Sequence, residues 1–174
     1  MPNPFGNVVY IQIRRRWVSI RLLGWSGRLG EWSGVPEVVF GQDGKGREHA
    51  YLPDDPRATT TIRPRAFIAF AHPRVVLDGF DDTVAALRIM LKLAGVPAQM
   101  VARTTYLLHI RDEWFGGVSD VERRALIEMA KWLGAGRVLF VDSPTELSPP
   151  EVLALVRSPQ AQTGSSVPLA GGVS

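Results

Sequence analysis

Two short runs that predict buried strands, joined through an amphipathic helix, constrain the fold of this 174-residue chain most strongly. The runs are residues 104–110 and residues 137–141. A strand that is apolar on both sides must be covered on both faces, which is typical of parallel strands in α/β proteins. The helix between them opens with a capping box, in which the side chains of Ser119 and Glu122 each accept from the other's backbone amide. The late part of the chain is therefore predicted to alternate buried strands with helices.

The first part of the chain has the pattern of antiparallel strands. Residues 8–13 are rich in β-branched side chains and residues 17–22 alternate apolar and polar, so together they predict a hairpin. Residues 24–34 contain four glycines and predict a turn region, after which residues 35–40 predict a third short strand. The remaining predictions here are a loop over residues 41–46, irregular chain over 47–64 with a short strand at 59–62, and a brief apolar segment over 67–70.

Three segments have the spacing of amphipathic helices. The first is predicted over residues 82–94 with Asp81 as its cap, the second runs from the capping box to about Leu133, and the third covers residues 151–156. The predicted apolar faces are Val84, Leu87, Leu91 and Ala94 in the first helix and Val121, Ala125, Met129 and Trp132 in the second.

A hairpin and a third strand, followed by strands that alternate with helices, give the order of a ribonuclease-H-like fold. We therefore predict one α/β domain over residues 1–157, with a mixed sheet and flanking helices. Residues 158–174 are dominated by Gly, Ser, Pro and Gln, and we expect a disordered tail there.

Composition excludes several classes of protein. The chain has no cysteine, which excludes disulfides, thiolate metal sites and cysteine nucleophiles, and its three histidines are scattered along the sequence. The net charge of +3 is small, and only Arg14, Arg15 and Arg16 resemble a basic patch, so nucleic acid is not the expected partner. No run is long enough for a membrane span, and the N-terminus lacks the pattern of a signal peptide, so we expect a cytoplasmic protein.

One long stretch of the chain resembles a known family. The sequence GVSDVERRALIEMA at residues 117–130, followed by LGAGRVLFV at residues 133–141, closely resembles the bacterial actin MreB family, the rod shape-determining proteins. In that family a Thr or Ser, two residues, then Glu-Arg-Arg-Ala open a helix, and Ala-Gly-Ala-Arg leads into the next strand. The resemblance extends over residues 7 to about 144 and corresponds to the first half of an actin fold.

The chain departs from the family at the residues that bind nucleotide. The family's first hairpin carries Asp-x-Gly-Thr, whose Asp helps to hold a hydrated metal ion and whose Gly lets the backbone wrap the phosphates. The aligned residues here are Gln12, Ile13, Arg14 and Arg15. Gln12 supplies no anionic oxygen for a hard cation, and Arg14 places a side chain where the loop must approach phosphate closely.

Two further departures concern the next strand and the second half. The family ends that strand with an acidic pair before Pro, whereas this chain has Asp142-Ser143-Pro144, and we assign no role to Asp142. The family's second half, which supplies the other phosphate loop and the adenosine pocket, has no counterpart after Pro144. Since ATP hydrolysis needs phosphates and metal held in one closed cleft, the resemblance implies a degenerate first half without ATPase activity, cofactor or metal.

The remaining candidate residues are a basic turn, a group of tryptophans and two polar positions. Arg14, Arg15 and Arg16 either grip an anion or form a solvated turn. Trp17, Trp25 and Trp32 fit either a partner interface or the core, with Trp25 and Trp32 as the candidate partner contacts. We interpret Asp112 and Glu113 as surface charges and His109 as a buried, hydrogen-bonded histidine rather than a base.

Together these features predict a non-catalytic protein that works through protein–protein contacts. The resemblance implies MreB or its associated cytoskeletal proteins as partners, and a role in bacterial cell shape. The alternative is a module that binds nucleic acid or a lipid headgroup through Arg14, Arg15 and Arg16. Because the face that packs against the second half would be exposed, we also expect a homodimer or an obligate partner.

Overall fold

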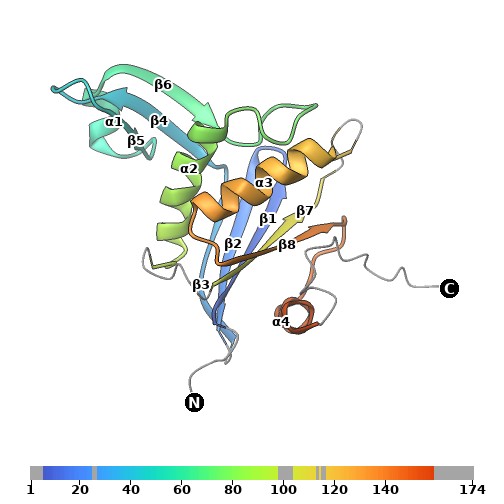
Figure 1. Cartoon of the computed structure of the whole chain (residues 1–174). Helices are drawn as coiled ribbons and strands as arrows, with labels where there is room; N and C mark the ends of the chain where they lie inside the picture. Colours follow the sequence, from blue (N-terminus) through green and yellow to red (C-terminus); the bar gives the residue numbers. More distant parts are fainter. Residues whose placement is uncertain (1–5, 25–26, 98–103, 113, 115–116, 159–174) are drawn as a thin grey trace.

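A five-stranded mixed sheet forms the body of the molecule (Figure 1). The computed structural model describes residues 6–24, 27–97, 104–112, 114 and 117–158. The sheet has the order β3-β2-β1-β7-β8 and consists of β1 (Val8–Arg14), β2 (Trp17–Gly24), β3 (Gly27–Gly34), β7 (Thr105–Ile110) and β8 (Arg137–Asp142). Strands β1, β2 and β3 pair antiparallel, whereas β7 is parallel to both β1 and β8. The predicted hairpin, the two buried late strands and the mixed sheet are confirmed.

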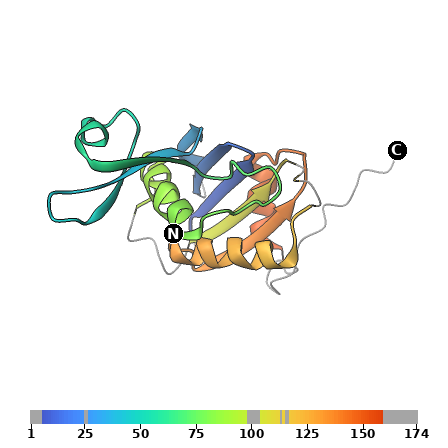
Figure 2. The ribbon, with the colours of Figure 1, turned by 90° about the horizontal axis from the view of Figure 1, so that it is seen from above.

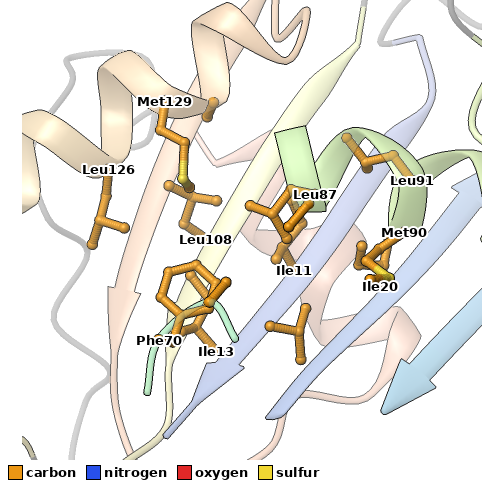
Figure 3. Close-up of a cluster of buried hydrophobic side chains, with 14 of the residues drawn as sticks. Ile11, Ile13, Ile20, Phe70, Leu87, Met90, Leu91, Leu108, Leu126 and Met129 are labelled. Atoms are coloured by element: carbon orange, nitrogen blue, oxygen red, sulfur yellow. The ribbon is translucent and has the colours of Figure 1, made fainter. Parts of the chain in front are cut away.

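Helices cover both faces of this sheet. They are α2 (Phe80–Leu93) and α3 (Asp120–Trp132) on one face and α4 (Pro149–Arg157) on the other (Figure 1). Side chains alternate across a strand, so Ile11 and Ile13 lie in the core beneath α2 and α3, while Val8 and Tyr10 pack in a second core with α4. Figure 3 shows the larger core, with Leu87 of α2 and the other labelled helix side chains turned toward the strands.

A smaller sheet lies beside one end of the main sheet (Figures 1 and 2). It has the order β5-β4-β6 and is made by β4 (Glu37–Gln42), β5 (Glu48–Tyr51) and β6 (Ile62–Ile68), with the one-turn helix α1 (Pro56–Thr60) between β5 and β6. Val38 and Phe40 of β4 are buried and belong to the core beneath α2 and α3. The two sheets are therefore joined by one continuous apolar core.

The predicted turn region at residues 24–34 is wrong, because most of it forms the edge strand β3. The glycines of this segment suggested a turn, but Gly30 is needed for close packing. At Gly30 a side chain would collide with the carbonyl of Ala94, at the end of α2, so only glycine allows this close approach. The strand predicted at residues 35–40 exists as β4, but it pairs in the smaller sheet and is not the third strand of the main one.

The irregular chain predicted over residues 47–64 is also wrong. It contains β5, α1 and the start of β6, and the short strand predicted at 59–62 falls across the end of α1. Two of the prolines that argued against regular structure lie at positions where helices and strands tolerate proline. Pro56 begins α1, and Pro64 lies in β6, an edge strand of its sheet.

The helices occur where predicted, but two details differ. Helix α2 buries its predicted face, yet its N-cap is Gly79 and not Asp81, which lies within the first turn. In α3 the capping box is confirmed, but the predicted apolar face is wrong. Val121 is 76% exposed and Trp132 62% exposed, while the buried side chains are Leu126, Met129 and Ala130. The buried stripe is rotated by about 90° around the helix axis from the predicted stripe, and both stripes contain Met129.

The corrected face of α3 predicts a contrast between two aliphatic truncations. Leu126→Ala should lower the free energy of unfolding by about 2–5 kcal/mol, because it leaves a cavity in the core. Val121→Ala should change it by less than about 0.5 kcal/mol, because Val121 lies in solvent. Chemical denaturation of the two variants and the parent chain measures both values. Equal losses at the two positions would contradict the observed face.

Candidate functional site

The carboxyl ends of the parallel strands meet at one edge of the main sheet. There the chain continues from β1 into the turn at Arg15 and Arg16, from β7 into Arg111 and Asp112, and from β8 into residues 143–148. In open α/β sheets this edge is the usual place for ligand binding. It also carries Gln12, Arg14 and Arg15, which the resemblance aligns with the family's phosphate-binding hairpin. The candidate site is therefore built from this edge.

Four charged and polar side chains fill the α4 side of this edge. This ion-pair cluster consists of Gln12, Arg21, Arg111 and Glu146. Gln12 is 1% exposed, and its Oε1 accepts from Arg111 Nη1 at 2.9 Å. The same Arg111 nitrogen lies 3.0 Å from Glu146 Oε2, and Arg21 Nη2 lies 2.8 Å from Glu146 Oε1. One carboxylate is thus shared between two guanidinium groups above a buried amide.

The cluster is tied to its surroundings at both ends. Arg111 Nη2 donates to the carbonyl of Pro144 at 3.2 Å, which holds the segment that follows β8. Arg21 Nε donates to Glu31 of β3 at 3.2 Å, which extends the ion pairs from β2 to the edge strand β3. Charge-assisted hydrogen bonds of this kind are the stronger ones in proteins. The cluster therefore connects the strands of the sheet to the chain that leads into α4.

The electrostatics of Glu146 favour the ionised carboxylate. Burial alone would raise the pKa of Glu146, but hydrogen bonds from Arg21 and Gln12 and the charges of Arg21 and Arg111 outweigh it, so the pKa is lowered. Burial likewise opposes the charge of Arg21, yet its bonds to Glu146 and Glu31 raise the pKa of the guanidinium. Both partners are thus held charged, and Arg21 and Arg111 already have their anion in Glu146.

His109 is buried and hydrogen-bonded through both ring nitrogens, as the sequence predicted. Its Nε2 lies 2.8 Å from the carbonyl oxygen of Ser143, which can only accept, so Nε2 carries the proton. Its Nδ1 therefore accepts from the hydroxyl of Tyr10 at 2.6 Å, and that hydroxyl accepts from the amide of Leu147 at 3.3 Å. Burial lowers the pKa of His109, which agrees with the neutral ring that this chain of hydrogen bonds requires.

The basic turn is anchored at its backbone and at one of its three side chains. The amide of Arg15 donates to Asp112 Oδ2 at 2.7 Å, and the amide of Arg16 donates to the carbonyl of Phe70 at 2.9 Å. Arg14 lies over the ring of Trp17 at 5.9 Å, and its Nε is 4.0 Å from Asp112. Asp112, predicted as a surface charge, is therefore a structural anchor of the hairpin, while the residues Arg15 and Arg16 are exposed. Glu113 lies outside the described residues.

Of the two predicted tryptophan contacts, Trp32 lies among the described residues, and it is not paired with the basic turn. Trp32 lies opposite Ile20 in the middle of β2, and it is half-buried against the core. Trp17, in contrast, lies at the hairpin end opposite Arg14. Trp25 lies outside the described residues, so its predicted contact stays a prediction. The anion-binding alternative for Arg14, Arg15 and Arg16 also stays a prediction.

The residues at this edge do not fit the metal–nucleotide complex that the resemblance would imply. The side chain of Gln12 is already bonded to Arg111, and it offers a neutral amide where a hard cation prefers carboxylate. Asp142 is exposed at the end of β8 and takes no part in the ion-pair cluster. Among the described residues, no group of three or more His, Asp or Glu side chains is placed to hold a metal ion.

Sequence reasoning identified Gln12 but missed its partners Arg21, Arg111 and Glu146. Gln12 and Glu146 are 134 positions apart, so no local pattern links them. A usable signal was present, because Arg111 directly follows one of the strands predicted to be parallel and Glu146 lies in the segment after the other. Charged residues at the carboxyl ends of such strands converge on one edge of the sheet.

Comparison with known proteins bears on the fold. No protein-family model matches this chain, and the curated proteins contain no match. Among solved structures, MreB5 of Spiroplasma citri bound to AMPPNP matches with a TM-score of 0.51 and 17% identity, over 80% of this chain and 39% of that one. MreB5 of Spiroplasma citri bound to ADP matches with a TM-score of 0.50 and 18% identity, over 78% of this chain and 37% of that one.

These likenesses show the fold. The chain has a partial MreB-like, actin-like fold, so the predicted ribonuclease-H-like half-fold is confirmed. It spans less than half the length of the MreB5 chains that it matches. Within the described residues, no helix has the length and apolar character that crossing a bilayer requires. The domain limit at residue 157 stays a prediction, although Ser158, assigned to the tail, caps the end of α4.

The neutral state of His109 predicts a loss of stability in mild acid. Its pKa is lowered in the folded chain, so below about pH 6.5 the unfolded chain takes up the proton first and stability falls as pH decreases. Thermal melts between about pH 7 and pH 5, above the range where carboxylates titrate, should show this slope. His109→Gln, which can keep both hydrogen bonds but does not titrate, should reduce the slope. An unchanged slope in His109→Gln would contradict the assignment.

Proposed function

We propose that this chain is a non-catalytic, MreB-like domain that acts through protein–protein contacts in bacterial cell shape or cytoskeleton regulation. The observation that carries the proposal is the ion-pair cluster at the carboxyl edge of the sheet. There Glu146 supplies the negative charge between Arg21 and Arg111, and Gln12 is engaged below it. The fold is retained while the edge where a ligand would bind is filled by the chain's own side chains.

The chemistry of phosphoryl transfer supports this reading. A transferred phosphoryl group needs a bound metal ion and preorganised positive groups that are free to face the phosphates. In this chain Arg21 and Arg111 face Glu146, and Gln12 brings no carboxylate to a metal. A nucleotide would have to displace Glu146 and would still lack the anionic oxygens that a hydrated Mg²⁺ ion prefers.

Exposed apolar side chains support contact with another protein. Val121 and Trp132 of α3 are 76% and 62% exposed, and Leu29 of β3 is 56% exposed. Single exposed apolar residues are normal, but an exposed tryptophan is the residue type most often found at the energetic centre of interfaces. We propose MreB or an associated cytoskeletal protein in the cytoplasm as the partner. The alternative partner for these exposed side chains is a second copy of this chain.

The proposal predicts that the chain does not bind Mg-ATP. Isothermal titration calorimetry of the purified chain with Mg-ATP should give no binding heat, because Glu146 occupies the positive groups and Gln12 cannot support the metal. Glu146→Gln, which removes the internal anion, should also give none, because Gln12 remains. MreB5 serves as the positive control for the titration. A saturable heat that depends on Mg²⁺ would contradict the non-catalytic assignment.

A second prediction concerns the partner. The chain should co-sediment with assembled MreB filaments, and the bound amount should saturate as the chain is added in excess. The controls are the chain without filaments and an unrelated protein of similar size with filaments. If the chain stays in the supernatant with MreB and with MreB-associated proteins, the proposed cytoskeletal role is wrong.

A further inference from the structure

An open groove lies between the carboxyl ends of α2 and α3, and it shares no residue with the ion-pair cluster. Its volume is about 620 Å³, within the range of sites that bind ligands or partner side chains. Leu91 and Tyr106, which are at most 5% exposed, contribute to its lining, and Val96 and Leu133 add further apolar surface. The Tyr106 hydroxyl donates to the carbonyl of Leu133 at 3.1 Å, so its polar atom is already satisfied. The groove therefore presents mainly apolar surface.

Trp132 is held in position beside this groove. It is 62% exposed, yet the ring of Phe80 meets it edge to face with centroids 6.1 Å apart. Its carbonyl accepts from Arg88 Nη2 of α2 at 3.3 Å, which ties the end of α3 to α2. An exposed aromatic ring that is already fixed loses little freedom when a partner covers it. Trp132 thus has the properties of an interface anchor and not of a loosely solvated side chain.

The charged residues of the groove are all positive. The described residues that line it include Arg88, Lys92 and Lys131 and no carboxylate. Lys92 and Lys131 lie in the last turns of α2 and α3, where the helix dipole favours cations, and Lys131 pairs with Glu128. The dipole does not explain Arg88, which lies in the preceding turn of α2, nor the apolar surface between the cations. An apolar groove lined by cations complements an apolar segment flanked by acidic residues.

We infer that this groove binds an acidic amphipathic segment of a partner protein, with apolar side chains against Trp132 and Leu91 and carboxylates near Lys92 and Arg88. The inference rests on the proposed contact function and names the surface and the chemistry of the contact. A flat, anionic membrane surface fits less well, because the groove is concave and its apolar residues lie within it. Residues 159–174 of the chain itself contain no Asp or Glu, so they lack the charge that the groove complements.

Binding of a synthetic peptide tests the inference directly. The probe is a fluorescein-labelled peptide of about 15 residues with leucines on one helical face and glutamates on the other, long enough to form a helix. Its comparison peptides are a scrambled sequence of the same composition and a version with lysine in place of glutamate. Fluorescence anisotropy with the full chain should show binding of the amphipathic acidic peptide, and binding at least about tenfold weaker for both comparison peptides.

Two variants with matched controls locate the binding. Trp132→Ala and Lys92→Glu should each weaken binding about tenfold. Ile62→Ala, which truncates another exposed apolar side chain, and Lys45→Glu, which makes the same charge change in the β4–β5 turn, should leave it unchanged. Circular dichroism melts of all four variants show that a loss of binding is not a loss of folding.

Two binding results would overturn the inference, as would one co-sedimentation result, and all three differ from failure of the proposed function. One is absent peptide binding, or peptide binding that Trp132→Ala and Lys92→Glu leave unchanged. The other is binding to phosphatidylglycerol vesicles that depends on Trp132 and Lys92, because that result assigns the groove to a membrane. If the chain co-sediments with MreB filaments equally well with and without Trp132→Ala, the contact function stands and the groove is not its surface.

Discussion

The hydrogen bonds of His109 determine how the chain is arranged after the main sheet is complete. The ring joins the Tyr10 hydroxyl to the Ser143 carbonyl, and the same hydroxyl receives the Leu147 amide. The segment after β8 is therefore fixed against β1 and β7 within a few residues of its start. This placement sets Glu146 between Arg21 and Arg111 and directs α4 back across the sheet. A buried polar group must be paired, so this arrangement tolerates little change.

The ion-pair cluster follows from that placement, and it gives the guanidinium of Arg111 a charged partner from within the chain. Arg111 has a side chain only 12% exposed, so it needs a partner close at hand. Glu146 and Gln12 meet that need from within the chain. The same groups would have to separate before phosphate or metal entered. The cluster thus pairs its own charges at the edge where open α/β sheets usually place ligands.

Local patterns predicted more of the fold than of the site. The capping box at Ser119, the apolar strands and the hairpin are signals carried by neighbouring residues, and each is present in the structure. The turn predicted at residues 24–34 was wrong because Gly30 allows close packing against the end of α2. The buried face of α3 was wrongly predicted because its sequence carries two overlapping apolar stripes. The cluster depends on partners such as Gln12 and Glu146, whose pairing only the assembled sheet creates.

We propose that Glu146 takes the position of a bound anion at the carboxyl edge of the sheet. A crystal structure of the chain grown with millimolar Mg²⁺ and AMPPNP is the decisive experiment. We expect the Glu146 carboxylate to lie between Arg21 and Arg111, with Gln12 bonded to Arg111 and no nucleotide at that edge. A nucleotide with its phosphates between the two arginines, and Glu146 displaced, would contradict it.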